Sequence, residues 1–172
     1  MTVLVGIANG ANVYIGADRG ASDENVIVSM SRPKVHVNGK WIYAYSGSIG
    51  TGQLLEFIKF PDPSTDDVYK LIRLNIVANL KTLIEKSGKT DDDQGSEFLI
   101  GASGRLFEFS TADWGVTEVY ETAGGSGNQI ALGSLYTSLL STIDIEERIE
   151  LALNAAITYS PSCQGPYDIL SV

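Results

Sequence analysis

The sequence holds few of the side chains that usually drive catalysis at neutral pH. His36 is the only histidine and Cys163 the only cysteine. A Ser-His-Asp triad would therefore depend on His36, and a Cys-His pair would need both residues. His36 stands in Lys34-Val35-His36-Val37, an alternating pattern typical of a strand, which favours a structural role for it. The two counts also exclude a disulfide framework and zinc modules built from several cysteines or histidines.

Thr2 offers another way to activate a hydroxyl. When a threonine is the first residue of a chain, its own α-amine, with a pKa of about 7.7 to 8.0, accepts the hydroxyl proton at neutral pH. A small side chain after the initiator methionine permits removal of that methionine. We therefore expect Met1 to be removed, which makes Thr2 a candidate nucleophile that carries its own base.

Two glycine-rich turns stand where a strand is expected to give way to a helix. The first is Gly47-Ser48-Ile49-Gly50-Thr51-Gly52, but Gln53 and Leu54 follow where a Walker loop needs Lys and Ser or Thr. Its backbone N–H groups still suit an anion or an oxyanion. The second, Gly124-Gly125-Ser126-Gly127, adds a hydroxyl. The alternative for both segments is an ordinary turn that caps a helix.

Composition limits the partners and ligands of this protein. The 172 residues carry a net charge of −9, the wrong sign for a surface that neutralises phosphates, so no nucleic-acid partner is expected. The run Asp91-Asp92-Asp93 suggests a site for Mg²⁺ or Ca²⁺, but adjacent acids between a helix and a strand are more typical of a solvated loop. We therefore expect no metal site and no cofactor.

The length favours one domain over residues 1–172, with 44% hydrophobic residues to build its core. No apolar run approaches the roughly 20 residues that span a bilayer, so no membrane segment is expected. The N-terminus lacks the basic lead and cleavage site of a signal peptide. These features together predict a cytoplasmic protein.

The elements that must position the candidate residues come in blocks of one type. Strands are predicted over 2–8, 13–17, 26–30, 34–37, 41–45, 97–102, 105–110, 116–122 and 167–172. Helices are predicted over 49–60, from a cap at Ser64 or Thr65 to a stop at Gly88, over 127–141 and over 144–159. Such blocks favour an α+β fold with antiparallel sheets and segregated helices. Two stacked sheets with a helix pair on each outer face, a four-layer αββα sandwich, would bury every apolar stripe.

Five short segments stand in a characteristic order along the chain. They are Thr2-Val-Leu-Val-Gly6, Ile15-Gly-Ala-Asp18-Arg19-Gly-Ala-Ser22, Arg32-Pro-Lys34-Val35, Ala44-Tyr-Ser-Gly47-Ser48 and Gly125-Ser126-Gly127-Asn128. The order and spacing resemble the signatures of proteasome β-type subunits and the bacterial HslV peptidase, which are N-terminal nucleophile (Ntn) hydrolases. The predicted element order also matches the αββα sandwich of that family. The chain is more similar to the HslV-like branch, where only a methionine precedes the threonine.

The resemblance implies a task for each residue of a threonine peptidase. Thr2 would attack a carbonyl through its Oγ1 while its α-amine takes the proton. Lys34 would lower the pKa of that amine and hydroxyl, and Asp18 would hold Lys34 charged and oriented. The Gly47 N–H would donate to the oxyanion, and Ser126 would assist proton transfer at the amine. By the same resemblance, the pocket beside the scissile bond would be lined by Ala21, Arg32, Tyr45 and Ile49.

The stretch 160–166 departs from the family pattern. Family members carry an Asp and a Ser just before a Gly near the last strand, where both support the threonine amine. Here Pro161 replaces that Asp and Gln164 replaces that Ser, and Asp168 is too deep in the strand to substitute. Reduced or altered activity is therefore an open alternative.

The leading hypothesis is a self-compartmentalising threonine endopeptidase that degrades peptides or unfolded proteins. The alternatives are a ring-forming scaffold without activity and a small-molecule Ntn amidase. The resemblance implies a closed homo-oligomer of twelve or fourteen chains. It also implies a separate ATP-dependent unfoldase, since this chain has no Walker motif.

Overall fold

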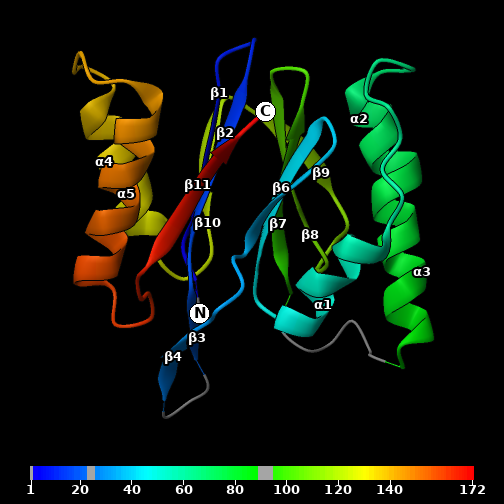
Figure 1. Cartoon of the computed structure of the whole chain (residues 1–172), viewed down its shortest axis with the longest axis horizontal. Helices are drawn as coiled ribbons and strands as arrows, with labels where there is room; N and C mark the ends of the chain where they lie inside the picture. Colours follow the sequence, from blue (N-terminus) through cyan, green and yellow to red (C-terminus); the bar gives the residue numbers. More distant parts are fainter. Residues whose placement is uncertain (1, 23–25, 89–94) are drawn as a thin grey trace.

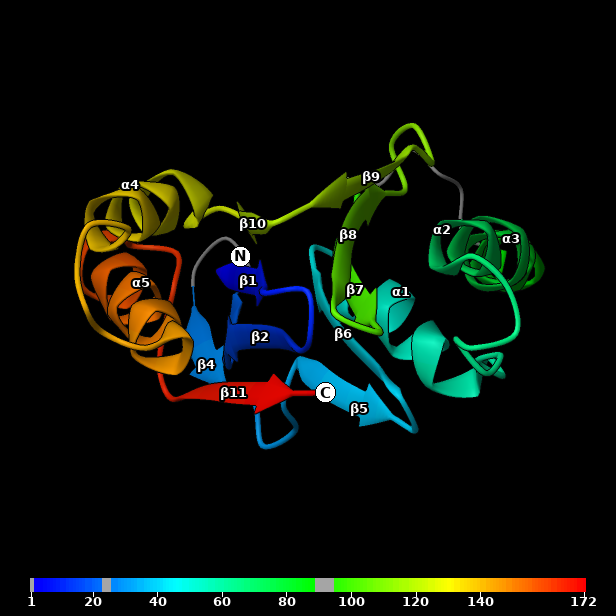
Figure 2. The same cartoon turned by 90° about the horizontal axis from the view of Figure 1, so that it is seen from above.

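The computed structural model describes residues 2–22, 26–88 and 95–172. Within these ranges, two sheets stack face to face and helices cover both outer faces, which makes four layers (Figures 1 and 2). The α+β class and the αββα sandwich predicted from the sequence are thus confirmed. The acidic run Asp91-Asp92-Asp93 lies outside the described residues.

The first sheet is antiparallel, with the order β10-β1-β2-β11. Its strands are β1 (Leu4–Ala8), β2 (Val13–Asp18), β10 (Glu121–Gly124) and β11 (Tyr167–Ser171). The turn between β1 and β2 contains Asn9 and Gly10, and Asn9 Oδ1 accepts hydrogen bonds there from the N–H groups of Ala11 and Asn12. Gly10 adopts a φ of +82° there, which favours glycine.

The second sheet is also antiparallel, with the order β5-β6-β7-β8-β9. Its strands are β5 (Val35–Asn38), β6 (Trp41–Ser46), β7 (Glu97–Ala102), β8 (Arg105–Ser110) and β9 (Val116–Val119). A separate hairpin pairs β3 (Gly20–Ser22) with β4 (Ile27–Ser29). The single strand predicted over 116–122 is wrong, because the chain leaves the second sheet at Tyr120, which is 87% exposed, and enters the first as β10.

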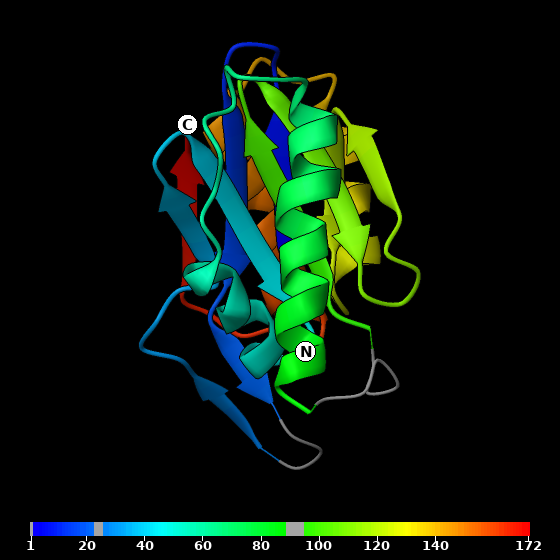
Figure 3. The same cartoon turned by 90° about the vertical axis from the view of Figure 1, so that its right-hand side faces the viewer.

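Helices cover the outer face of each sheet. On the second sheet lie α1 (Ile49–Gln53), the 3-10 turn η1 (Leu54–Phe57), α2 (Val68–Leu71), the π-helical segment η2 (Ile72–Val77) and α3 (Ala78–Lys86). Figure 3 shows α2 to α3 as one continuous helix across that face. On the first sheet lie α4 (Asn128–Ser138) and α5 (Ile145–Tyr159). The long helix is capped by Asp67, whose side chain accepts from the Lys70 N–H, and not by Ser64 or Thr65.

Among the described residues, three apolar clusters fill the spaces between the four layers. Leu4, Ile15, Val35, Ile42 and Leu106 belong to the cluster between the two sheets. A second cluster joins β6, β7 and β8 to the long helix, and a third joins β1 to α4 and α5. In β1, for example, Leu4 faces the cluster between the sheets while Val5 and Ile7 face the helices, as the pleat requires.

The antiparallel pairing brings several strand ends to one edge of the sandwich. In the first sheet, Leu4 at the start of β1 pairs with Ala17 on one side and with Gly124 on the other. In the second sheet, Val35 at the start of β5 pairs with Ala44 near the end of β6. All five of the predicted catalytic positions lie at these strand ends or just beyond them. Among the described residues, no helix is both long and apolar enough to cross a membrane.

Candidate functional site

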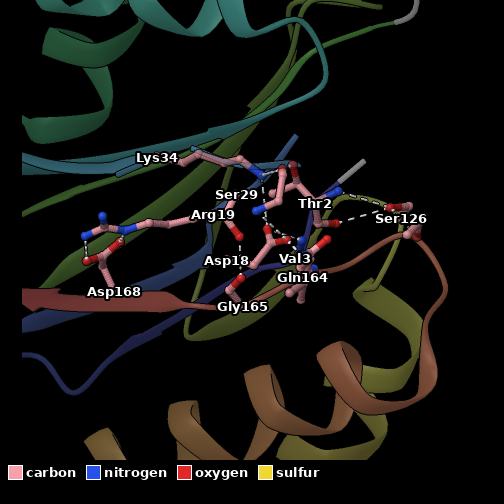
Figure 4. Close-up of polar contacts among 12 residues, drawn as sticks. Thr2, Val3, Asp18, Arg19, Ser29, Lys34, Ser126, Gln164, Gly165 and Asp168 are labelled. Carbon is pink, nitrogen blue, oxygen red and sulfur yellow. Dashed lines mark hydrogen bonds and ion pairs between the residues drawn. The ribbon is translucent and has the colours of Figure 1, made fainter. Parts of the chain in front are cut away.

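Thr2 and Lys34 meet at this edge although they precede strands of different sheets (Figure 4). Lys34 Nζ donates a hydrogen bond to Thr2 Oγ1 at 2.6 Å. The two residues are 3% and 2% exposed, so the contact is shielded from water. An ammonium group at this distance favours ionisation of the hydroxyl, because the opposite charge stabilises an alkoxide.

Asp18 anchors the site from the end of β2 and is fully buried. Its Oδ1 accepts from the Val3 N–H at 3.0 Å and from Lys34 Nζ at 3.1 Å. Its Oδ2 accepts from the N–H groups of Gly20 at 3.2 Å and Gln164 at 3.0 Å. The four donors use the four acceptor positions of a carboxylate. Asp18 therefore ties the Thr2 segment, the start of β3 and the segment before β11 to one charged group.

Lys34 is held as a cation by an equally complete set of partners. Besides Thr2 Oγ1 and Asp18 Oδ1, its ammonium donates to the backbone carbonyl of Gly20. Burial lowers the pKa of Lys34, and the charge and hydrogen bond of Asp18 oppose that effect. The site therefore holds a desolvated ammonium whose charge acts strongly on its neighbours.

The turn at Gly47 is shaped by a positive φ and by close packing. Gly47 has a φ of +88°, and a Cβ there would lie 2.9 Å from the Cα of Ser96. The Oγ of Ser96 accepts from the Ser48 N–H at 3.2 Å, and the Oγ of Ser48 caps α1 by accepting from the Thr51 N–H. Ser96, which immediately precedes β7, thus braces the turn, a role that nothing in its sequence context indicates.

Ser126 reaches the backbone of Thr2 from the turn between β10 and α4 (Figure 4). Its Oγ accepts from the Thr2 N–H at 3.2 Å and donates to the Thr2 carbonyl at 3.3 Å. The preceding Gly125 has a φ of +80°, and a Cβ there would collide with the Thr2 carbonyl. Glu97 accepts a hydrogen bond from the Gly125 N–H and so fixes this turn from β7.

A small pocket opens beside Thr2. Its lining includes three of the four residues expected to bind substrate, namely Ala21, Tyr45 and Ile49, together with Gly47. The ring of Tyr45 packs directly against Gly52 and occupies the space that a Cβ at position 52 would need. Tyr45 is only 2% exposed. Arg32 is not among the lining residues. Its side chain is 61% exposed and pairs with Glu56 at 2.7 Å.

The segment that departs from the family pattern reaches the site with different groups. Gln164 contributes its backbone N–H to Asp18. Ser162, which the sequence reasoning missed, donates from its Oγ to Ser126 Oγ at 2.9 Å. The only signal for it was its place after a predicted helix. Asp168 lies on β11 and pairs with Arg19 at 2.6 Å.

The single histidine and cysteine have other surroundings. The imidazole of His36 stacks on Tyr43 with ring centroids 5.3 Å apart, and its Nε2 is buried without a hydrogen-bond partner among the described residues. Cys163 is buried in the cluster under α4 and α5. In the ranges 2–22, 26–88 and 95–172, no three His, Cys, Asp or Glu side chains gather in a way that suits a metal ion.

Comparison with known proteins identifies relatives by sequence and by fold. No protein-family model matches the chain. Proteasome subunit beta 1 of Thermococcus kodakarensis is 30% identical over 162 residues, which cover 90% of this chain and 78% of that protein. The structure of Thiobacillus denitrificans BPH in complex with epoxomicin superposes with a TM-score of 0.80 at 20% identity, covering 99% and 98% of the two chains. Eukaryotic HslV from Trypanosoma brucei gives a TM-score of 0.75 at 16% identity, covering 99% of this chain and 98% of its own.

Proposed function

Because the chain belongs to the proteasome β-subunit family, we propose that it is a threonine peptidase in which Thr2, freed of Met1, is the nucleophile. The observation that carries the proposal is the buried contact of 2.6 Å between Lys34 Nζ and Thr2 Oγ1. A hydroxyl in this position is primed to lose its proton, and the α-amine of the same residue is the base within reach. Peptides and unfolded proteins are the proposed substrates.

In the first step, Thr2 Oγ1 attacks the carbonyl carbon of the scissile peptide bond. The hydroxyl proton passes to the α-amine, which becomes an ammonium, and the carbonyl π electrons move onto oxygen. The ammonium then gives its proton to the leaving nitrogen as the C–N bond breaks, which leaves an ester on Thr2. In the second step, the amine takes a proton from water, the hydroxide attacks the ester, and Thr2 Oγ1 is released as a hydroxyl.

Lys34 and Asp18 supply the electrostatic part of this mechanism. The ammonium of Lys34 stabilises negative charge as it forms on Thr2 Oγ1, and its effect is large because water is excluded. Asp18 keeps Lys34 charged and oriented through a contact of 3.1 Å. The Gly47 turn lines the same pocket, so its backbone N–H is the proposed donor to the oxyanion.

Two measurements test the proposal. Intact-mass analysis of protein isolated from its native host is expected to show loss of Met1, and quantitative retention contradicts the catalytic proposal because an amide nitrogen is no base. Epoxomicin is the ligand of the Thiobacillus protein, so it is a suitable covalent probe for Thr2. Wild-type protein is expected to gain the mass of one epoxomicin and to cleave a fluorogenic peptide.

The Thr2→Ala variant is expected to lose both activities and to keep its thermal unfolding temperature. Thr2→Ser restores a hydroxyl at the same position and is expected to recover part of the cleavage. The matched control is Thr137→Ala, because Thr137 lies on α4 and its hydroxyl donates to the Gly133 carbonyl of the same helix. Cleavage by Thr2→Ala at the wild-type rate rules out the mechanism.

A scaffold without activity is the second candidate. It is favoured by Pro161 and Gln164, which stand where family members carry an Asp and a Ser that support the amine. The small volume beside Thr2 and the buried Tyr45 favour a third candidate, an amidase for small molecules. Absence of an epoxomicin adduct from Met1-free protein supports the scaffold, and an adduct without peptide cleavage supports the amidase.

We also propose a closed homo-oligomer of twelve or fourteen chains in the cytoplasm. Large apolar side chains support it, because α4, α5 and the turn between them expose Tyr136, Leu140 and Tyr159 by 76%, 95% and 77%. A net charge of −9 per chain means that such contacts must be apolar or charge-paired to overcome repulsion. A separate ATP-dependent unfoldase is the proposed partner. Light scattering at micromolar concentration that finds only monomers contradicts the assembly.

A further inference from the structure

Three serine hydroxyls form a row that leads away from the backbone nitrogen of Thr2. Ser126 Oγ lies 3.2 Å from that nitrogen, Ser162 Oγ lies 2.9 Å from Ser126 Oγ, and Ser160 Oγ lies 2.8 Å from Ser162 Oγ. Ser160 and Ser162 are each 8% exposed. They follow α5, whereas Ser126 precedes α4, so the row spans two segments far apart in the sequence. We call Ser126, Ser162 and Ser160 the serine row.

The count of donors and acceptors gives the serine row one direction. A hydroxyl has one proton and two lone pairs. Ser126 spends its proton on the Thr2 carbonyl, so it accepts from both Thr2 N–H and Ser162. Ser162 spends its proton on Ser126 and must accept from Ser160, whose Oγ in turn accepts from the Ser162 N–H at 3.3 Å. With the protons placed in this way, a lone pair of Ser126 faces the Thr2 nitrogen.

We propose that the serine row orients the α-amine of Thr2 and, because it carries no charge, leaves that amine neutral and able to accept a proton at neutral pH. Ser162 and Ser160 are positioning residues in this arrangement, since they act through Ser126. The inference rests on the proposed function for its meaning in catalysis. A carboxylate in the place of Ser162 would instead favour the ammonium form.

The charged and titratable groups around the amine come from three sides. The Lys34 ammonium, hydrogen-bonded to Thr2 Oγ1, disfavours a positive charge on the amine. The Asp18 carboxylate, which accepts from the Val3 N–H, favours a positive charge there. Glu97 contacts the Gly125 N–H beside Ser126. Burial raises the pKa of the Cys163 thiol, so Cys163 is neutral at physiological pH. A negative charge introduced at position 162 would be separated from the amine by the Ser126 hydroxyl alone, so it would add to the groups that favour the ammonium form.

The test measures the pKa of the amine directly and does not require turnover. The protein is released from a cleavable N-terminal fusion so that the chain starts at Thr2. The rate of acetylation of the α-amine by acetic anhydride is followed against pH, with mass spectrometry of the N-terminal peptide as the readout. The variants are Ser162→Asp and Ser162→Ala, and the control is Ser138→Ala, which removes another buried serine hydroxyl from α4.

Ser162→Asp is expected to raise the amine pKa by about one unit, a tenfold change in its protonation equilibrium, and to move the acid limb of kcat/KM to higher pH. Ser162→Ala is expected to lower kcat about tenfold, with KM within about twofold of wild type. Ser138→Ala is expected to match wild type in both respects. If Ser162→Asp does not fold, Ser160→Asp places the charge one hydroxyl further away and is expected to raise the pKa by about half a unit.

An amine pKa within about 0.2 units of wild type in the folded Asp variant overturns the inference. The inference is also overturned if Ser162→Ala and Ser138→Ala have the same kcat. Failure of the proposed function has a different signature, because every protein, wild type included, then lacks peptide cleavage and an epoxomicin adduct. In that case the acetylation measurement still decides whether the serine row controls the amine.

Discussion

Replacement of Asp18 by asparagine keeps the size of the side chain and removes half of its accepting capacity. The carboxylate accepts from Val3 N and Lys34 Nζ on Oδ1 and from the N–H groups of Gly20 and Gln164 on Oδ2. An amide has one oxygen, so its NH₂ group must face two N–H donors in either orientation. Two hydrogen bonds to an ionised acceptor are therefore lost whichever way the amide turns.

The magnitude follows from those two bonds. A hydrogen bond to a charged group contributes about 1.5 to 3 kcal/mol, so Asp18→Asn is expected to lower the free energy of unfolding by about 3 to 6 kcal/mol. Domains are typically stable by only about 5 to 15 kcal/mol, so the variant should unfold at a much lower urea concentration. Asp18 is fully buried, which means that water cannot replace the lost partners.

The assay is urea unfolding followed by the fluorescence of Trp41 and Trp114, at one protomer concentration for all proteins because assembly shifts apparent stability. The matched control is Asp168→Asn, since Asp168 and Arg19 are partly exposed and water can take their places. A clearly smaller loss is expected for that control. A loss below about 1 kcal/mol for Asp18→Asn, or one equal to the control, refutes the reasoning about the saturated carboxylate.

Three further outcomes are expected. Lys34→Met removes the cation beside Thr2 Oγ1 and should lower kcat/KM for a fluorogenic peptide at least a hundredfold, as judged against wild type of equal active-site titre. Gly47→Ala forces a Cβ to within 2.9 Å of Ser96 and should lower both the melting temperature and cleavage, whereas Gly39→Ala, with a φ of +62° and open space, should keep cleavage. For His36, desolvation lowers the pKa below the unfolded value of about 6.5, so the unfolded chain binds more protons and stability falls as the pH drops below about 6.5. His36→Phe should flatten this loss in unfolding measured from pH 7.5 to 5, and equal slopes for the two proteins contradict it.

Local pattern was enough to predict most of the architecture. Asn-Gly turns, period-two strands and apolar stripes at helical spacing act between residues close in the chain, so they are legible in the sequence. One error was local, because the long helix is capped by Asp67 and not by Ser64 or Thr65. Another fell where a distant contact overrides local preference. The segment 116–122 was read as one strand, but it is divided because its two halves pair with different sheets.

For the site, the sequence alone determined which chemistry remained. One histidine and one cysteine removed the usual ways to activate a nucleophile, and Thr2 stood where its own amine can act as base. The glycine-rich turns around positions 47 and 125 were also visible in the sequence. Both glycines have a positive φ, which only glycine readily adopts.

The family resemblance, and no local pattern, placed Asp18, Lys34 and Ser126 beside Thr2, and only the tertiary structure added Ser162 and the Gln164 N–H to the site. Thr2 and Ser126 are separated by 124 positions, and Ser126 and Ser162 by 36, so no local rule could pair them. The same holds for the backbone N–H of Gln164 on Asp18, 146 positions away. Hydrogen bonds are made over about 3 Å and depend on the packing of whole layers, which turns strand ends from both sheets toward one edge. Residue types and the family resemblance determined the candidates, and the stacking of the two sheets decided their partners.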